Sequence, residues 1–309
     1  MTDSAAIEFR RLVKDYGGVR ALDGIDLRVE QGEIFGFLGP NGAGKTTAIR
    51  CLLDLIRPTS GQALVLGLDS RADSVAARAR IGYLPGDLSL YDTLTGEETI
   101  AYFASLRPKP LDHTYLDMLI TRLTFEPQRP VGALSKGNRQ KLGLILAMMN
   151  QPEVLVLDEP TAGLDPLAQA VVEELLGDVA GEGRTVFFSS HILSEVDQIC
   201  HRVGIIRAGK IVAVEELAML KGRALHVIEV TFARPVPPGA FDLPGVQELR
   251  RDGSVIHLEV RSNLDAVLKA IARYEVVDLR TEQPSLEQTF LAFYQESPAA
   301  RQEASPAVP

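Results

Sequence analysis

An eight-residue glycine-rich segment, Gly39 to Thr46, limits most strongly what this chain can fold into. Its letters, G-P-N-G-A-G-K-T, fit a pattern that holds phosphate groups when it follows a buried strand and opens a helix. Here the apolar run Glu33–Leu38 precedes it, and the helical periodicity of Thr46–Ile56 follows it until Pro58. The segment therefore predicts an α/β fold with a phosphate site at the carboxyl end of a strand.

The same loop indicates which phosphate compound binds. Backbone N–H groups of a glycine-rich loop turn towards phosphate oxygens, and the N-terminus of the following helix adds a partial positive charge. Lys45 is expected to reach the β and γ phosphates and Thr46 to ligate Mg²⁺, so the expected ligand is ATP or another nucleoside triphosphate with magnesium. The residues expected to line this site are Gly39, Pro40, Asn41, Gly42, Ala43, Gly44, Lys45, Thr46 and Thr47.

A second part of the site is expected where the apolar run Val154–Leu157 ends in two carboxylates. Asp158 is expected to hold the magnesium ion, usually through its water shell, and Glu159 to orient or deprotonate the attacking water. The alternative is that both residues only form a turn, as acidic residues at strand ends often do. Beside a phosphate loop, two adjacent carboxylates favour hydrolysis over phosphate transfer to an acceptor.

His191 is a third candidate, because it follows the β-rich run Thr185–Ser190 and should emerge at the carboxyl edge of the sheet. A neutral imidazole there can hydrogen-bond the γ-phosphate and position Glu159 and the water. The alternative is a histidine at a helix start that is capped by Ser190.

Composition and charge exclude several other classes of protein. The hydrophobic content of 46% fills an ordinary core, and the net charge of −9 includes no basic arm, so nucleic acid is not an expected partner. Cys51 and Cys200 stand alone, which suits a reducing compartment. No signal peptide is visible, and the longest uncharged apolar run, Leu142–Met149, is too short to span a membrane. A cytoplasmic chain without lipid insertion of its own is expected.

The N-terminal part of the chain is expected to form a nucleotide-binding domain over residues 1–222. Residues 7–29 read as short strands broken at Gly17-Gly18 and at Asp23-Gly24. Helical signals dominate from Ala72 to Gln151, including a capping box at Thr95, and predict a helical subdomain at about 86–150.

After Lys221-Gly222 the composition changes, which predicts a domain boundary there. Residues 223–296 are expected to form a small α+β accessory domain with helices near 264–274 and 285–294. Residues 297–309, rich in Ala, Pro and Ser, predict a disordered tail.

Two further motifs connect these elements to a known family. Leu134-Ser-Lys-Gly-Asn138 opens a helix 23 residues before Asp158, and Gly163-Leu-Asp-Pro166 follows Glu159. Together with the phosphate loop, Asp158-Glu159 and His191, these motifs resemble the nucleotide-binding subunit of ABC transporters over roughly residues 7–222. The resemblance implies a P-loop NTPase fold: a RecA-like parallel-sheet core, an antiparallel β subdomain and a helical subdomain.

The resemblance also implies partners. In this family two cassettes pair head to tail, so a homodimer is expected in which Ser135, Lys136 and Gly137 of one chain cover the γ-phosphate held by the other. Ser135 reads as the N-cap of its helix, which with the helix dipole makes a second anion site. Tyr16 matches the family's adenine-stacking aromatic; the alternative is a surface tyrosine before a Gly-Gly turn.

Two positions depart from the family pattern. Lys136 and Asn138 stand where the family most often has glycine and glutamine, which puts a cation near the anion site. Gly86 stands where most members carry the glutamine that contacts magnesium and the attacking water, and Asp87 or a water molecule is expected to fill the gap.

The resemblance predicts an ATP-binding and ATP-hydrolysing subunit that powers export of a drug or antibiotic through a separate polytopic membrane permease. The segment 86–106 is expected to dock that permease, which would hold the chain at the inner face of the membrane. Residues 81–98 and 284–291 are similar to the ATPases of bacterial antibiotic and multidrug exporters. The alternatives are export of lipid, polysaccharide or Na⁺, a soluble ABC ATPase of repair or translation, and a plain P-loop kinase or switch, which would leave Ser135–Gly137 unused.

Overall fold

The chain forms two compact units, residues 1–217 and 218–309, in a computed structural model that describes residues 5–107, 110–217, 226–260 and 263–282. The expected boundary at 221–223, the expected helix at 285–294 and the tail from 297 lie outside the described residues. The two units are described separately below.

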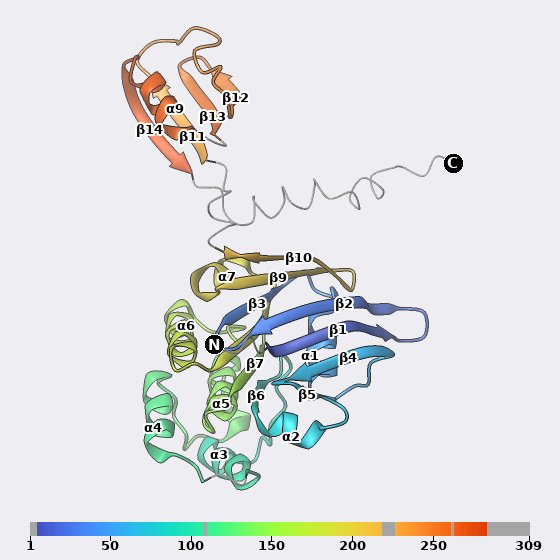
Figure 1. The fold of residues 1–309 in the computed structure, drawn as a ribbon. Helices are drawn as coiled ribbons and strands as arrows, with labels where there is room; N and C mark the ends of the chain where they lie inside the picture. The colour runs from blue at the N-terminus through green and yellow to red at the C-terminus, as the bar shows by residue number, and fades with distance from the viewer. Residues whose placement is uncertain (1–4, 108–109, 218–225, 261–262, 283–309) are drawn as a thin grey trace, which may run out of the picture. The chain divides into compact units, whose positions relative to one another are not determined.

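A six-stranded sheet forms the centre of the first unit (Figure 1), in the order β10-β9-β3-β8-β7-β6. β3, β6, β7, β8 and β9 run parallel, and β10 pairs antiparallel with β9 at the edge. The strands are β3 (Ile34–Leu38), β6 (Ile81–Leu84), β7 (Val154–Asp158), β8 (Thr185–Ser190), β9 (Arg202–Arg207) and β10 (Lys210–Glu216). Every residue of β3, β7 and β8 is buried, as in parallel sheets whose two faces are covered.

The helices that cover this sheet follow its strands in the chain. α1 (Lys45–Leu52) follows β3, α6 (Pro166–Gly181) lies between β7 and β8, and α7 (Leu193–Ile199) lies between β8 and β9. Such alternation of parallel strands and helices brings the carboxyl ends of β3, β7 and β8 to one edge of the sheet. Among the described residues, no helix combines the length and the apolar character that a membrane span requires.

Aromatic packing stabilises the centre of the sheet. The Phe187 ring of β8 lies 5.9 Å from that of Phe35 and 5.4 Å from that of Phe37, both on β3. All three side chains are fully buried, and each contributes roughly 1.5–3 kcal/mol by its burial. The strands that end at the phosphate loop and at His191 are thus joined by a rigid apolar layer.

The first unit also contains an antiparallel sheet, ordered β2-β1-β4-β5. Its strands are β1 (Ala5–Asp15), β2 (Arg20–Glu30), β4 (Ser60–Val65) and β5 (Leu68–Asp69). The expected break at Asp23-Gly24 is wrong, because β2 continues through it as a bulge: Leu12 pairs with Ile25 and Val13 with Asp23. Gly24, at φ 68°, takes the left-handed conformation that this extra residue needs.

A helical insertion lies between β6 and β7. Its elements are α3 (Gly96–Ser105), α4 (His113–Arg122), the 3₁₀ turn η1 (Val131–Ala133) and α5 (Lys136–Met148). The capping box at Thr95 is confirmed, since its hydroxyl accepts from the Glu98 N–H while the Glu98 carboxylate accepts from the Thr95 N–H. The helical signal from Ala72 onwards is only partly right: α2 (Ser74–Ala79) is followed by β6, whose backbone pairs with β7 in the buried sheet.

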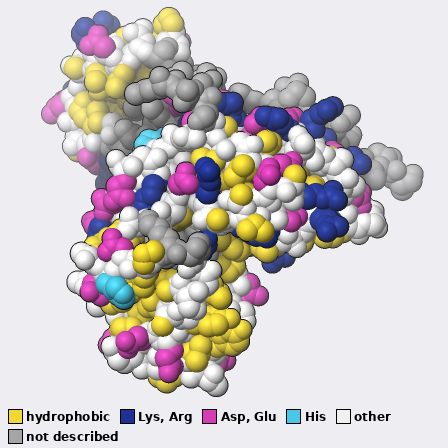
Figure 2. All heavy atoms as spheres, turned by 60° about the horizontal axis from the view of Figure 1, so that its bottom comes forward, with side chains coloured by type: hydrophobic (Ala, Val, Ile, Leu, Met, Phe, Trp, Pro, Cys, Tyr) yellow, Lys and Arg dark blue, Asp and Glu magenta, His cyan; other side chains and the backbone are white. Residues whose placement is uncertain are grey.

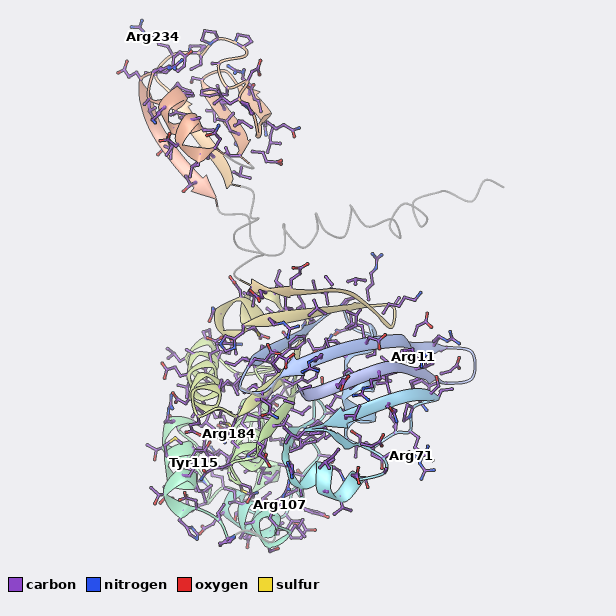
Figure 3. All side chains as sticks on the ribbon, in the orientation of Figure 1. Arg11, Arg71, Arg107, Tyr115, Arg184 and Arg234 are labelled. Carbon is purple, nitrogen blue, oxygen red and sulfur yellow. The ribbon has the colours of Figure 1, made fainter. Side chains whose placement is uncertain are left out.

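One contact between the insertion and the sheet region joins Tyr115 of α4 to Arg184, which precedes β8 (Figure 3). The Arg184 guanidinium lies 5.6 Å from the centre of the Tyr115 ring and donates a hydrogen bond to its hydroxyl at 3.2 Å. This stacked cation connects the outer helix α4 to the start of a central strand.

The second unit is a four-stranded antiparallel sheet, ordered β12-β13-β11-β14, with helix α9 (Leu264–Ile271). The strands are β11 (His226–Phe232), β12 (Val246–Asp252), β13 (Val255–Val260) and β14 (Val276–Glu282). The expected helix ends three residues early, at Ile271, and β14 was not expected from the sequence. Apolar residues of β11, β13 and α9 form the core of this unit.

Candidate active site

The phosphate loop connects β3 to α1, and its glycines are required by geometry. Gly44 is the N-cap of α1 at φ 115°, a backbone conformation that side-chain-bearing residues rarely adopt. A Cβ atom on Gly39 would lie 2.3 Å from the Ile206 carbonyl oxygen, so the loop passes directly against β9. Pro40, Asn41 and Gly42 form the exposed rim of the loop.

Lys45 lies inside the loop and is buried. Its ammonium group donates hydrogen bonds to the carbonyl oxygens of Gly39, at 2.6 Å, and Pro40, at 3.3 Å. Burial lowers the pKa of Lys45, while the negative charges of Glu159 and Asp158 act in the opposite direction. The cation is thus held among loop carbonyls within electrostatic reach of both carboxylates.

Asp158 ends β7 beside the first turn of α1. Its Oδ2 accepts a hydrogen bond from the Thr46 hydroxyl at 2.8 Å, and its Oδ1 accepts one from the Ser189 hydroxyl. This pair fits Mg²⁺, which takes one or two oxygen ligands from a protein and fills its shell with phosphate oxygens and water. Among the residues that the structure describes, no group of three or more His, Cys, Asp and Glu could hold a metal, so an ion here depends on ligands from the nucleotide and solvent.

Glu159 and His191 face one another at the same sheet edge. The Glu159 Oε1 lies 2.9 Å from His191 Nδ1, and both side chains are partly exposed, at 30% and 42%. The Glu159 backbone has φ 54°, in the left-handed region, a strained conformation that is common at functional sites. A carboxylate that is oriented by an imidazole next to a second carboxylate that fits Mg²⁺ can orient water and accept its proton.

Side chains from two other helices hold the segment after Glu159. The buried Gln140 amide of α5 donates to the carbonyl oxygens of Glu159, at 3.0 Å, and Pro160, at 2.9 Å. The Thr161 hydroxyl donates to Glu195 Oε1 of α7 at 2.5 Å. Two helices, α5 and α7, therefore hold the backbone from Glu159 to Thr161 in place.

Ser135, Lys136 and Gly137 form the N-terminus of α5. Ser135 caps this helix as predicted, since its hydroxyl accepts from the Asn138 N–H at 3.2 Å. The neighbours of Gly137 are Gly163 and Leu164: a Cβ atom on Gly137 would lie 2.9 Å from the Gly163 carbonyl oxygen. The two motifs through which the chain resembles ABC cassettes thus touch within one chain.

Tyr16 lies in the turn between β1 and β2 and is 52% exposed, with the Lys14 ammonium 4.8 Å from the centre of its ring. The next strand, β2, passes the phosphate loop, because a Cβ atom on Gly44 would lie 2.6 Å from the Ala21 carbonyl oxygen. An exposed ring on this hairpin is available for stacking.

Gly86, the position that departs from the family pattern, lies beside Asp158. A Cβ atom on Gly86 would lie 3.2 Å from Asp158 Oδ2. The Gly86 backbone therefore lies close to the carboxylate, and Gly86 and Asp87 are both exposed.

The structure brings together three parts of the predicted site: the phosphate loop, Asp158 with Glu159, and His191. The structure also adds four residues that the sequence analysis did not predict as part of the site: Ser189, Gln140, Thr161 and Glu195. Gln140 could have been predicted from the sequence, because it is a polar residue five positions after Ser135 on a helix that is otherwise apolar on its buried side. No sequence pattern predicted the contact between Glu195 and Thr161, since these residues are 34 positions apart in the chain.

A comparison with protein families gives the class of this protein. Residues 22–162 match the ABC transporter family model, and relatives of the same class align over most of the chain. The chain belongs to the ABC transporter family, as an ATP-binding subunit that hydrolyses ATP.

Two of the similar proteins are named for antibiotic transport or drug resistance. The bacitracin transport ATP-binding protein BcrA of Bacillus licheniformis is 39% identical over 228 residues, which are 73% of this chain and 74% of BcrA. The daunorubicin resistance ATP-binding protein DrrA3 of Streptomyces coeruleorubidus is 35% identical over 292 residues, 90% of this chain and 92% of DrrA3. A solved ATP-binding subunit of an ABC transporter superposes with a TM-score of 0.65 at 26% identity, over 70% of this chain and 92% of that one.

Proposed function

We propose that the chain hydrolyses ATP with Mg²⁺ at the edge formed by β3, β7 and β8. In this proposal Lys45 and the loop amides hold the triphosphate, Thr46 and Asp158 hold the ion, and Glu159 with His191 activates water. The ion supplies charge neutralisation on the phosphates. The observation that carries the proposal is that the Thr46–Asp158 and Glu159–His191 pairs occupy adjacent positions at the end of β7.

The second part of the proposal is a head-to-tail homodimer in which α5 of one chain completes the site of the other. ATP-binding cassettes of this family work in pairs. Within one chain, Ser135 caps α5 and Gly137 lies against Gly163, at the end of the helix where unpaired N–H groups attract an anion. The anion of this second site is the γ-phosphate that the partner holds.

Mixing two defective variants tests whether Ser135 acts across the dimer. Ser135→Ala and Lys45→Ala are each expected to be nearly inactive alone. In the mixed dimer, one site combines an intact phosphate loop with an intact Ser135, and the other site has lost both. An equal mixture should therefore recover about one quarter of wild-type ATPase activity, because half of the dimers are mixed and each has one complete site. Activity no higher than the mean of the two variants would contradict the trans arrangement.

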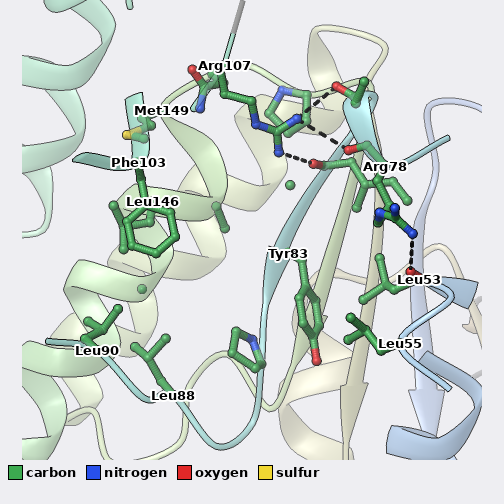
Figure 4. A pocket seen from close by; sticks show the side chains of 18 of the residues that line it. Leu53, Leu55, Arg78, Tyr83, Leu88, Leu90, Phe103, Arg107, Leu146 and Met149 are labelled. Atoms are coloured by element: carbon green, nitrogen blue, oxygen red, sulfur yellow. Dashed lines mark hydrogen bonds between the residues drawn. The ribbon is translucent and has the colours of Figure 1, made fainter. Parts of the chain in front are cut away.

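An apolar cavity of about 350 Å³ is the proposed docking site for a helix of the membrane permease (Figure 4). Leu88, Leu90, Phe103 and Leu146 lie on one side of it, and Leu53, Leu55 and Tyr83 on the other. The cavity thus separates the helical insertion from β6 and the segment after α1. The Arg107 guanidinium closes one end by donating to the carbonyl oxygens of Arg78, Ala79 and Ile81.

The same cavity is adjacent to the nucleotide site. Pro85 lines the cavity, and a Cβ atom on the next residue, Gly86, would lie 3.2 Å from Oδ2 of Asp158, the proposed magnesium ligand. Burial raises the pKa of Tyr83 in the cavity wall to about 12, with a smaller contribution from the negative charge of Asp158. Around the cavity, Tyr91, Tyr102 and Leu106 are exposed by 58%, 42% and 62%. Figure 2 shows hydrophobic side chains gathered on this side of the first unit. Exposed aromatic residues around an apolar cavity are typical of a protein-docking surface.

The exported compound is proposed to be a drug, an antibiotic or a related molecule, because BcrA and DrrA3 are named for bacitracin transport and daunorubicin resistance. Docking would place the chain in the cytoplasm, on the inner face of the membrane. Expression together with its permease in a sensitive host should raise the inhibitory concentration of the exported compound several-fold. Glu159→Gln in the same pair should remove that gain; resistance that persists without hydrolysis would contradict the energy-coupling role.

A further inference from the structure

Glu195 of α7 receives two short hydrogen bonds from two different loops of the site. The Thr161 hydroxyl donates to its Oε1 at 2.5 Å and the Ser190 hydroxyl donates to its Oε2 at 2.6 Å. Hydrogen bonds to a charged acceptor are roughly twice as strong as those between neutral groups. Each oxygen of the half-buried carboxylate therefore anchors one loop.

The Ser190 contact fixes the chain on both sides of His191. Besides donating to Glu195, the Ser190 hydroxyl accepts a hydrogen bond from the Ile192 N–H at 2.9 Å. The residues before and after His191 are thus tied to one hydroxyl. His191 itself is 42% exposed and its side chain contacts Glu159, so its backbone position sets where the imidazole lies.

The Thr161 contact fixes the other partner of that pair. Thr161 is buried and lies two residues after Glu159, and its carbonyl oxygen accepts from the Leu164 N–H at 3.1 Å. A shift of Thr161 would move Glu159 on one side and the turn to Leu164 and Asp165 on the other. The Gln140 contacts hold the Glu159 and Pro160 carbonyl oxygens but leave the Thr161 side chain to Glu195.

We propose that Glu195 is a positioning residue for hydrolysis: one carboxylate sets the distance between the Glu159 loop and the His191 loop, and couples that distance to the turn at Leu164. This inference rests on the proposed roles of Glu159 and His191. The inference identifies Glu195 as the group that keeps Glu159 and His191 together. It also predicts that movement of the Leu164 turn at a dimer interface changes the Glu159–His191 distance.

The competing interpretation is that Glu195 only stabilises the start of α7, where a negative charge is favourable. A structural role of that kind changes stability and leaves the turnover of the folded protein unchanged. A positioning role lowers kcat at saturating ATP while the affinity for ATP stays the same, because small displacements of aligned groups slow the chemical step.

Glu195→Ala in the full chain, assayed with saturating Mg²⁺-ATP, is expected to lower kcat about 10-fold, with KM and the equilibrium affinity within about two-fold. Glu195→Gln keeps the shape and one acceptor oxygen and should recover part of the loss. Thr161→Val and Ser190→Ala each remove one of the two hydrogen bonds, and each should lower kcat by less than Glu195→Ala. If Glu195→Ala does not fold, the kcat values of Thr161→Val and Ser190→Ala test the positioning role instead. Wild-type kcat in the folded variants would overturn the proposal.

A second comparison shows whether Glu195 acts through His191. In a His191→Ala background, Glu195→Ala should cause a smaller further loss of kcat than in the wild type, since Glu159 is then the only member of the pair left to position. A further loss as large as in the wild type would show that Glu195 does not act through His191. Glu174→Gln removes a 70% exposed carboxylate of α6 and is the charge-matched control, expected to have wild-type turnover. If His191→Ala itself has wild-type kcat, the proposed catalytic role of His191 fails. If His191→Ala is slow but the Glu195 variants have wild-type kcat, only the positioning role of Glu195 fails.

Discussion

Glu159→Gln should bind ATP with unchanged affinity and hydrolyse it at least about 100-fold more slowly. The amide has the size of the carboxylate and can keep a hydrogen bond to His191 Nδ1, which lies 2.9 Å from Oε1 in the native pair. It cannot accept the proton of the attacking water. Since positioned general bases contribute about 10²–10⁴-fold to rates, losing that capacity outweighs any effect on binding. The blocked variant should accumulate as a nucleotide-bound dimer.

Two measurements separate binding from chemistry in this variant: equilibrium titration with ATP, and single-turnover hydrolysis with enzyme in excess. Size-exclusion chromatography with Mg²⁺-ATP reports the dimer. Glu153→Gln is the matched control, because Glu153 precedes β7 as Glu159 follows it and its side chain is 59% exposed. Turnover of Glu159→Gln close to that of the control would remove Glu159 from the chemistry.

The contacts between the phosphate loop and Asp158 were accessible from the sequence because they follow from strand order and strand ends. Buried runs ending at Leu38, Asp158 and Ser190 lie side by side in a parallel sheet, so their carboxyl ends must meet. Local capping signals were equally readable at Thr95 and Ser135. Each of these inferences needs only residues near in the chain and the geometry of parallel sheets.

Features that depend on backbone detail or distant partners were not accessible in this way. The bulge at Gly24 depends on register with β1, and a glycine alone reads equally well as a break. The left-handed backbone of Glu159 is imposed by its surroundings, against the preference of a glutamate. The contacts of Glu195 join residues that only the packing of α7 brings together.

Lys45→Ala should remove measurable ATP binding. In the structure the Lys45 ammonium is held by the Gly39 and Pro40 carbonyl oxygens at the centre of the loop, the position from which it can turn to phosphates. Hydrogen bonds to charged groups contribute about 1.5–3 kcal/mol each, so losing contacts with two phosphates weakens Kd by about 100-fold or more. Alanine also leaves the neighbouring negative charges of Asp158 and Glu159 without their cation, which disfavours a polyanion further.

Equilibrium titration with a fluorescent ATP analogue checks this result, and thermal unfolding confirms that the variant is folded. Lys269→Ala is the control, because it removes a 74% exposed ammonium from the second unit and should bind as the wild type does. Full affinity in a folded Lys45→Ala chain would refute the phosphate site at the β3–α1 loop. The outcome also bears on Thr46 and Asp158, because magnesium at that pair depends on phosphate oxygens to complete its shell.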